Sequence, residues 1–155
     1  MKKLVKIYGE RNTGTNYIDR LIRMNLEAHM LTGVAPSHIQ ILQRILPGKQ
    51  LVRDRYFELT YRKNLGWKHT KIKSESELRH YKILKRGVCF VTVTKNPYSW
   101  LLSMHRNPYH SGRREESFRQ FLLTPWKTVG RENHPETFAN PVRMWNEKNR
   151  SYLEL

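Results

Sequence analysis

Two segments of the chain carry basic, hydroxyl and amide side chains next to apolar stretches. The first segment, residues 9–16, reads Gly-Glu-Arg-Asn-Thr-Gly-Thr-Asn. The second begins at Lys95, close after an apolar run, and has Ser103 eight residues further on. Cations, hydroxyls and the backbone N–H groups at a helix start are groups that hold a phosphate or a sulfate. The two segments together predict a binding site for an anion.

The first segment lies between a predicted strand and a predicted helix. Apolar and charged residues alternate over residues 4–8, which indicates a short strand. Beyond Thr15, apolar residues recur at helical spacing, at Ile18, Leu21, Ile22 and Leu26. Gly14 lets the backbone approach a ligand closely, but no Lys-Ser or Lys-Thr pair follows it, so this is not a Walker A loop. Taken alone, the segment is explained equally well as an ordinary turn with a solvated arginine.

The two segments together resemble motifs of the sulfotransferases that use 3′-phosphoadenosine 5′-phosphosulfate (PAPS). In that family a basic-Ser/Thr-Gly-Thr loop after the first strand holds the 5′-phosphosulfate, and an Arg and a Ser eight residues apart hold the 3′-phosphate. Residues 11–15 are similar to the first motif, and Lys95 with Ser103 to the second. Asn12 stands where the family has its loop cation, and Lys95 keeps the charge of the family's arginine without its bidentate fork.

The resemblance, which covers about two-thirds of the chain, implies a site and a reaction. The nucleotide donor would be bound by Arg11, Asn12, Thr13, Gly14, Thr15, Asn16, Lys95 and Ser103. A sulfuryl group would pass to a hydroxyl or amine of an acceptor, such as a carbohydrate or a small molecule, and no metal is required. Arg11 is expected to stabilise the leaving group, with Lys68 as second choice, and His69 to act as the base. A histidine in a basic surface loop is the equally common alternative for His69.

Other side chains are weaker candidates for contact with an acceptor. His105 and His110 follow the second motif, and the basic residues Arg113, Arg114 and Arg131 could meet an anionic acceptor, although a solvated charged surface is the commoner explanation. Among the aromatic residues, which could stack on adenine or a sugar, Trp100 is expected in the core.

The pattern of elements predicts an α/β fold, as one domain over residues 1–155, with helices around a mainly parallel sheet. The apolar run 87–94 is expected to be a central strand covered on both faces, which buries Cys89. Residues 65–70 could form a further strand that ends at His69. Ser74 and Glu77 have the spacing of a capping box and predict a helix to about residue 85. Further helices are expected at 36–46, 98–105, 116–123 and 142–152. The resemblance makes this a three-layer, P-loop NTPase-like sulfotransferase fold.

Composition limits the alternatives. The 155 residues include 29 Lys and Arg against 13 Asp and Glu, a formal net charge of +16, which favours anionic partners. With one cysteine there is no internal disulfide, and no apolar stretch is long enough to span a membrane, so a cytoplasmic protein is expected. One rival interpretation is a basic nucleic-acid-binding module, for which no recognition motif is evident. Another is a P-loop kinase, which would need a loop lysine and a metal-binding carboxylate that this sequence does not clearly show. A third is a sulfotransferase-like domain that binds nucleotide without turnover, either minimal, fragmentary or completed by a partner.

Overall fold

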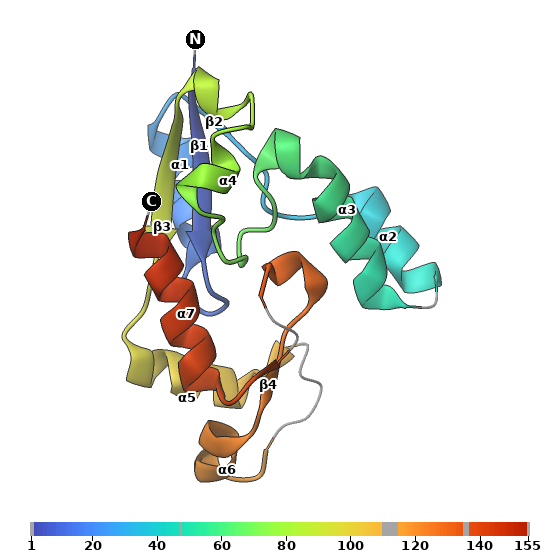
Figure 1. Cartoon of the computed structure of the whole chain (residues 1–155), viewed down its shortest axis with the longest axis vertical. Coiled ribbons are helices and arrows are strands. Elements are labelled where there is room, and N and C mark those ends of the chain that lie inside the picture. Colours follow the sequence, from blue (N-terminus) through green and yellow to red (C-terminus); the bar gives the residue numbers. More distant parts are fainter. Residues whose placement is uncertain (1, 47, 110–114, 135–136, 155) are drawn as a thin grey trace.

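The computed structural model describes residues 2–46, 48–109, 115–134 and 137–154. At its centre is a parallel three-stranded sheet in the order β2-β1-β3, with strands β1 (Lys3–Gly9), β2 (Ala28–Met30) and β3 (Val88–Val93) (Figure 1). Leu4 pairs with His29 of β2 on one side and with Val88 of β3 on the other. Strands and helices alternate along this part of the chain, so the α/β class and the parallel sheet are confirmed.

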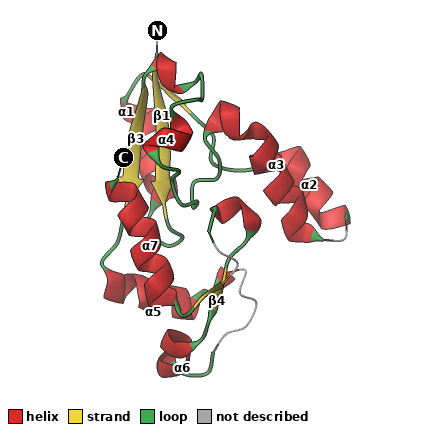
Figure 2. Ribbon diagram, viewed as in Figure 1, coloured by secondary structure: helices red, strands yellow, loops and turns green. Residues whose placement is uncertain are grey.

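Helices make up most of the remaining structure (Figure 2). They are α1 (Thr15–Asn25), α2 (Ser37–Ile45), α3 (Lys49–Asn64), α4 (Glu75–Leu78), α5 (Pro97–Arg106), α6 (Phe118–Leu123) and α7 (Pro141–Leu153), with the short 3-10 turns η1 (Leu84–Arg86) and η3 (Gly130–Glu132). A small antiparallel ladder pairs β4 (Trp126–Lys127) with β5 (Thr137–Phe138). The helices expected near 36–46, 98–105, 116–123 and 142–152 are therefore present as α2, α5, α6 and α7.

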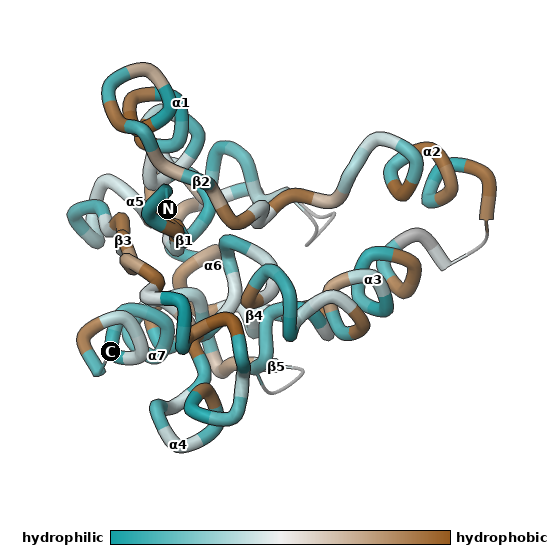
Figure 3. The backbone as a smooth tube through the Cα atoms, turned by 90° about the horizontal axis from the view of Figure 1, so that it is seen from above, coloured by the Kyte–Doolittle hydropathy of each residue, from teal (hydrophilic) through white to brown (hydrophobic). Residues whose placement is uncertain are grey.

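The sheet is covered on both faces (Figure 3). Val5 and Ile7 of β1 pack on one face against Ile18 and Ile22 of α1. On the other face lies a cluster that contains Leu4, Tyr8, Leu65, Ile72, Leu78 and Tyr152. Burial of each such side chain contributes about 1.5–3 kcal/mol, so packing on both faces holds the sheet between its helices.

The position of β3 differs from the prediction. We expected the apolar run 87–94 to be central, whereas β1 is the central strand and β3 lies at the edge of the sheet. The run is apolar because Val88 and Phe90 pack on one face and Val91 and Val93 on the other. Cys89, expected to be buried, is exposed at this edge.

Two further predictions of local structure were wrong. Residues 65–70 form a loop rather than a strand, because Leu65 and Gly66 have φ angles of 59° and 79°, in the left-handed region that a strand cannot contain. The capping box of Ser74 and Glu77 is present, but α4 ends at Leu78. The chain then continues in tight turns to η1.

Helices α2 and α3 pack against each other and project to one side of the sheet (Figure 1). Near its start, α3 contacts the turn η3. Arg131 of η3 donates a hydrogen bond to Gln50 of α3, although the two residues are 81 positions apart in the sequence. Within the described part of the chain, no helix is both long enough and apolar enough to cross a membrane.

Candidate anion-binding site

The loop between β1 and α1 leaves the start of the helix uncapped. Gly14 is the N-cap residue, with a φ of 93°, and among the described residues no side chain caps the first turn of α1 with a hydrogen bond. A Cβ atom built on Gly14 would meet no atom within 4 Å, so the space in front of the loop is open. The hydroxyl of Thr13, by contrast, donates to the carbonyl oxygen of Glu10 at 2.6 Å within the loop. Backbone N–H groups are therefore available to an anion at this helix start.

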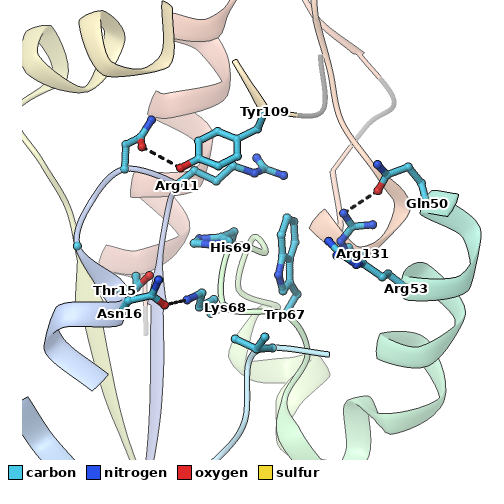
Figure 4. A pocket seen from close by; sticks show the side chains of 13 residues that line it. Arg11, Thr15, Asn16, Gln50, Arg53, Trp67, Lys68, His69, Tyr109 and Arg131 are labelled. Atoms are coloured by element: carbon cyan, nitrogen blue, oxygen red, sulfur yellow. Dashed lines mark hydrogen bonds between the residues drawn. The ribbon is translucent and has the colours of Figure 1, made fainter. Parts of the chain in front are cut away.

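A cavity of about 750 Å³ opens in front of this loop (Figure 4). The loop, the segment 67–69, α3 and η3 surround it. The described residues that line it include no aspartate or glutamate, and they are Arg11, Asn12, Gly14, Thr15, Asn16, Val34, Gln50, Arg53, Trp67, Lys68, His69, Tyr109 and Arg131. Five of the nucleotide-binding residues expected from the first segment thus line one cavity with the expected base.

His69 is held in one orientation at the end of β1. Its Nδ1 lies 2.5 Å from the carbonyl oxygen of Gly9. Since a carbonyl only accepts, Nδ1 carries the proton and Nε2 keeps a free lone pair. Burial, together with the charge of Arg11, lowers the pKa of His69 well below its ordinary value of 6.5. At neutral pH this imidazole is therefore uncharged and has a lone pair at Nε2, although its lowered pKa makes it a weaker base than an ordinary histidine.

Lys68 reaches the first turn of α1, although it comes from a distant part of the chain. Its backbone N–H donates to the carbonyl oxygen of Gly33 at 3.2 Å, and its carbonyl oxygen accepts from Gly9 N at 2.9 Å. Its ammonium group donates to the side-chain oxygen of Asn16. Burial lowers the pKa of Lys68. The tertiary structure thus brings a lysine to the loop of residues 9–16, a segment that itself contains no lysine.

Arg11 belongs to a buried network of charges that the sequence did not reveal. Its guanidinium lies 3.2 Å from an oxygen of Glu10 and 2.8 Å from one of Glu132. Lys148 of α7 contacts the other oxygen of each carboxylate and donates to the carbonyl oxygen of His69 at 2.8 Å. Burial alone would raise the pKa of Glu132, but the charges of Lys148 and Arg11 lower it to about 2. Two carboxylates thus balance the two cations, so little of the charge of Arg11 remains for a ligand.

Arg131 lies inside the structure, where a solvated position was the commoner expectation. It is 6% exposed, and its guanidinium donates to Asp54 at 2.6 Å and to Gln50 at 2.8 Å. The guanidinium groups of Arg131 and Arg11 lie 4.4 and 4.7 Å from the ring centre of Trp67. The ring of Trp67, which lines the cavity, therefore contacts two guanidinium groups.

Three residues of the cavity wall were missed in the sequence. They are Val34, which follows β2, and Gln50 and Arg53 on α3, a stretch in which no clear periodicity identified a helix. Tyr109, one of the aromatic residues that could stack on a ligand, follows α5. The hydroxyl of Tyr109 donates to the side-chain oxygen of Asn12 at 3.0 Å, which links Tyr109 to the loop between β1 and α1. Only their shared location in the fold identifies these residues.

The second motif comes together as expected, outside the residues that line the cavity. The ammonium of Lys95 lies 2.9 Å from the hydroxyl oxygen of Ser103, which in turn donates to the carbonyl oxygen of Ser99 at 2.8 Å. The same helix supports the first loop, because the indole N–H of Trp100 donates to the carbonyl oxygen of Arg11 at 2.9 Å. Trp100 is fully buried, as predicted.

The remaining candidates do not join this site. His105 packs against Phe118 and Phe121 and does not line the cavity. His110, Arg113 and Arg114 lie outside the described residues. In the described ranges, no three His, Cys, Asp or Glu side chains are grouped so that they could hold a metal ion.

Comparison of the chain with protein-family models, curated proteins and solved structures found no match.

Proposed function

We propose that this chain binds PAPS and transfers its sulfuryl group to an acceptor, on a P-loop NTPase-like sulfotransferase fold. One observation carries the proposal: Lys68 and His69, tied to the end of β1, lie beside the uncapped start of α1 in a cavity lined by cations. An anion site and a neutral base thus share one cavity, which is the combination that group transfer from an anionic donor requires.

The residues present fit such a donor. The open space at Gly14 and the free N–H groups of α1 suit the 5′-phosphosulfate. Lys95 and Ser103 form a cation–hydroxyl pair for the 3′-phosphate, and Ser103 lies on α5, the helix that supports the same loop. When bound, the donor would supply the sulfuryl group and a bisphosphate that leaves.

The chain's own residues would then perform two tasks. His69 takes the proton of the acceptor hydroxyl at Nε2 as the bond from that oxygen to sulfur forms. The bond between sulfur and the phosphate oxygen breaks, and the ammonium of Lys68 stabilises the charge that develops on that oxygen. We assign this task to Lys68 rather than Arg11, because Glu10 and Glu132 already balance Arg11.

A thermal-shift titration with adenosine 3′,5′-bisphosphate, without metal, tests donor binding. We expect the bisphosphate to stabilise the wild type, and the stabilisation to weaken in Lys95→Ala and Ser103→Ala. Lys85→Ala is a matched control, since Lys85 is exposed near the other end of β3. Stabilisation only by ATP with Mg²⁺ would instead indicate a kinase, and salt-sensitive RNA or DNA binding that ignores the bisphosphate would indicate a nucleic-acid module.

Nucleotide binding without turnover is the second candidate. The pairing of Arg11 with Glu10 and Glu132 favours this role. Transfer would need a loop cation that acts on the donor, and Arg11 is already neutralised. Transfer of ³⁵S from labelled PAPS to a panel of hydroxyl acceptors separates the two functions. A chain that binds the bisphosphate and yields no labelled product across sugars, phenols and alcohols would support the binding role.

A further inference from the structure

We infer that the wall of the cavity formed by α3 and η3 binds the acceptor, and that this acceptor is a carbohydrate with an acidic group. The inference rests on the proposed function and adds to it the chemical class of the acceptor. It starts from the cations of this wall, Arg53 and Arg131, which lie across the cavity from Asn16 and Lys68 (Figure 4).

The two arginines keep donors that the protein does not use. Arg131 is 6% exposed, and its Nε–H makes no hydrogen bond among the described residues. The Nε–H of Arg53 is also buried without a hydrogen-bond partner, and within the described ranges Arg53 has no ion pair. Buried donors that lack a partner are costly. Both side chains line the cavity, so an anion that enters it can offset part of this cost through the charge of the guanidinium groups.

The balance of charge assigns one cation to each side of the cavity. Asp54 pairs with Arg131, and the carboxylates of the buried network pair with Arg11 and Lys148. Neither Lys68 nor Arg53 belongs to an ion pair among the described residues, although the negative charge of Asp19 acts on Lys68. Lys68 lies at the start of α1, where the proposed donor places its sulfate. Arg53 is therefore left for a second anion, which belongs to the acceptor.

The polarity of the lining selects a carbohydrate over an aromatic or steroid acceptor. Apart from Val34 and the rings of Trp67, His69 and Tyr109, the lining side chains are amides, hydroxyls and cations. Gln50 accepts from Arg131 through its oxygen, which leaves its amide N–H groups to donate to a ligand. A guanidinium binds a carboxylate in a paired geometry, so a uronic acid meets both features of the wall.

Isothermal titration with two tetrasaccharides tests this inference. The acidic probe is the hyaluronan tetrasaccharide, in which glucuronic acid alternates with N-acetylglucosamine, and the neutral probe of equal length is chitotetraose. Both are titrated into the full chain saturated with adenosine 3′,5′-bisphosphate. We expect the wild type to bind the acidic probe about 10-fold more tightly than the neutral one, and Arg53→Gln to remove that preference.

Arg55→Gln is the matched control. Arg55 lies on the same helix, is 68% exposed and pairs with Glu58, so its loss changes the net charge equally without touching the cavity. We expect Arg55→Gln to change the affinity for the acidic probe by less than about 2-fold. Equal losses in both variants would reduce the effect to net charge and overturn the inference. Equal affinity for the two probes would overturn it as well.

Failure of the inference is distinguishable from failure of the proposed function. A wild type that the bisphosphate stabilises but that binds neither tetrasaccharide keeps the donor site and loses the acidic acceptor. Binding of the acidic probe that depends on Arg53, in a chain that the bisphosphate does not stabilise, keeps the acidic-sugar site and removes sulfuryl transfer. Thermal melting of Arg53→Gln with the bisphosphate verifies that the variant is folded and still binds the donor analogue.

Discussion

His69 and Gly9 are joined at the end of the central strand: the imidazole donates from Nδ1 to the carbonyl oxygen of Gly9 across 2.5 Å. The N–H of Gly9 donates in turn to the carbonyl oxygen of Lys68 at 2.9 Å. Strand β1, which leads into the loop before α1, therefore also positions the proposed base. A Cβ atom on Gly9 would lie 2.6 Å from the carbonyl oxygen of Val93, so only glycine fits at this junction.

Replacement of His69 tests its role as base. Glutamine can still donate to the Gly9 oxygen but cannot take a proton, so we expect His69→Gln to lower the rate of sulfuryl transfer about 100-fold or more. Stabilisation by the bisphosphate should remain, because His69 is not assigned to the phosphates. A variant that keeps most of the wild-type rate in the ³⁵S assay would remove His69 from the mechanism.

The pH profile provides a separate test of His69. The pKa of His69 is well below 6.5, so the imidazole is already neutral at pH 6.5 and stays neutral at higher pH. We expect the transfer rate to stay level as the pH falls from about 7.5 to 6, where a histidine of ordinary pKa would lose much of its activity. A decline centred near 6.5 would show that the imidazole is not buried as the structure has it.

The left-handed conformation of Gly14 predicts a linked loss of stability and binding. With a φ of 93°, Gly14→Ala should lower the free energy of unfolding by about 1–2 kcal/mol and weaken bisphosphate binding, since the loop must distort. Gly87→Ala is the control: the φ of Gly87 is 71°, a Cβ there also meets nothing within 4 Å, and Gly87 lies just before β3. We expect a similar loss of stability from Gly87→Ala with no effect on the bisphosphate. An equal effect of both variants on binding would contradict this.

The buried network predicts a stability cost in acid. The pKa of Glu132 is about 2 in the folded chain, below its ordinary value of 4.5, so its stabilising contribution is present above about pH 4.5 and is lost as the pH falls toward 2. Glu132→Gln leaves Arg11 and Lys148 with one carboxylate, and we expect a loss of about 3 kcal/mol at pH 7 by urea unfolding. Glu58→Gln, at an exposed pair, should change stability by less than about 0.5 kcal/mol.

Lys6 predicts a pH dependence of the same sign in a higher pH range. It is fully buried in β1, where its ammonium donates to the carbonyl oxygens of Asn64 and Gly66 at 2.6 and 2.5 Å. Burial lowers its pKa from 10.5 to about 7, so the unfolded chain binds an extra proton between these values and stability rises with pH across that window. We expect Lys6→Met to remove this contribution, at most about 1.4 kcal/mol per pH unit. Lys3→Met, at an exposed position of the same strand, should leave the wild-type slope unchanged.

Features that depend on neighbours in the sequence could be predicted. The strand, the glycine loop and α1 follow from local alternation, turn residues and helical spacing over residues 4–26. Asn96 caps α5, so the helix starts just after Lys95. Two helical turns then place Ser103, eight residues after Lys95, beside the lysine ammonium. These elements are set by backbone geometry that short segments determine on their own.

Features that depend on contact between distant segments were decided only by the tertiary structure. The run around β3 is equally apolar at the edge of a sheet and at its centre, because its burial comes from the two faces. Nothing in the sequence indicated that Arg11 is paired, because Glu132, which packing places against its guanidinium, is 121 residues away. Among the described residues, the same packing leaves Arg53 without a carboxylate partner. Charge pairing depends on distance in space, which the order of residues along the chain does not contain. The sequence thus predicted a glycine loop between a strand and a helix, and the packing of α3, η3 and α7 decided which cations beside it are paired with carboxylates.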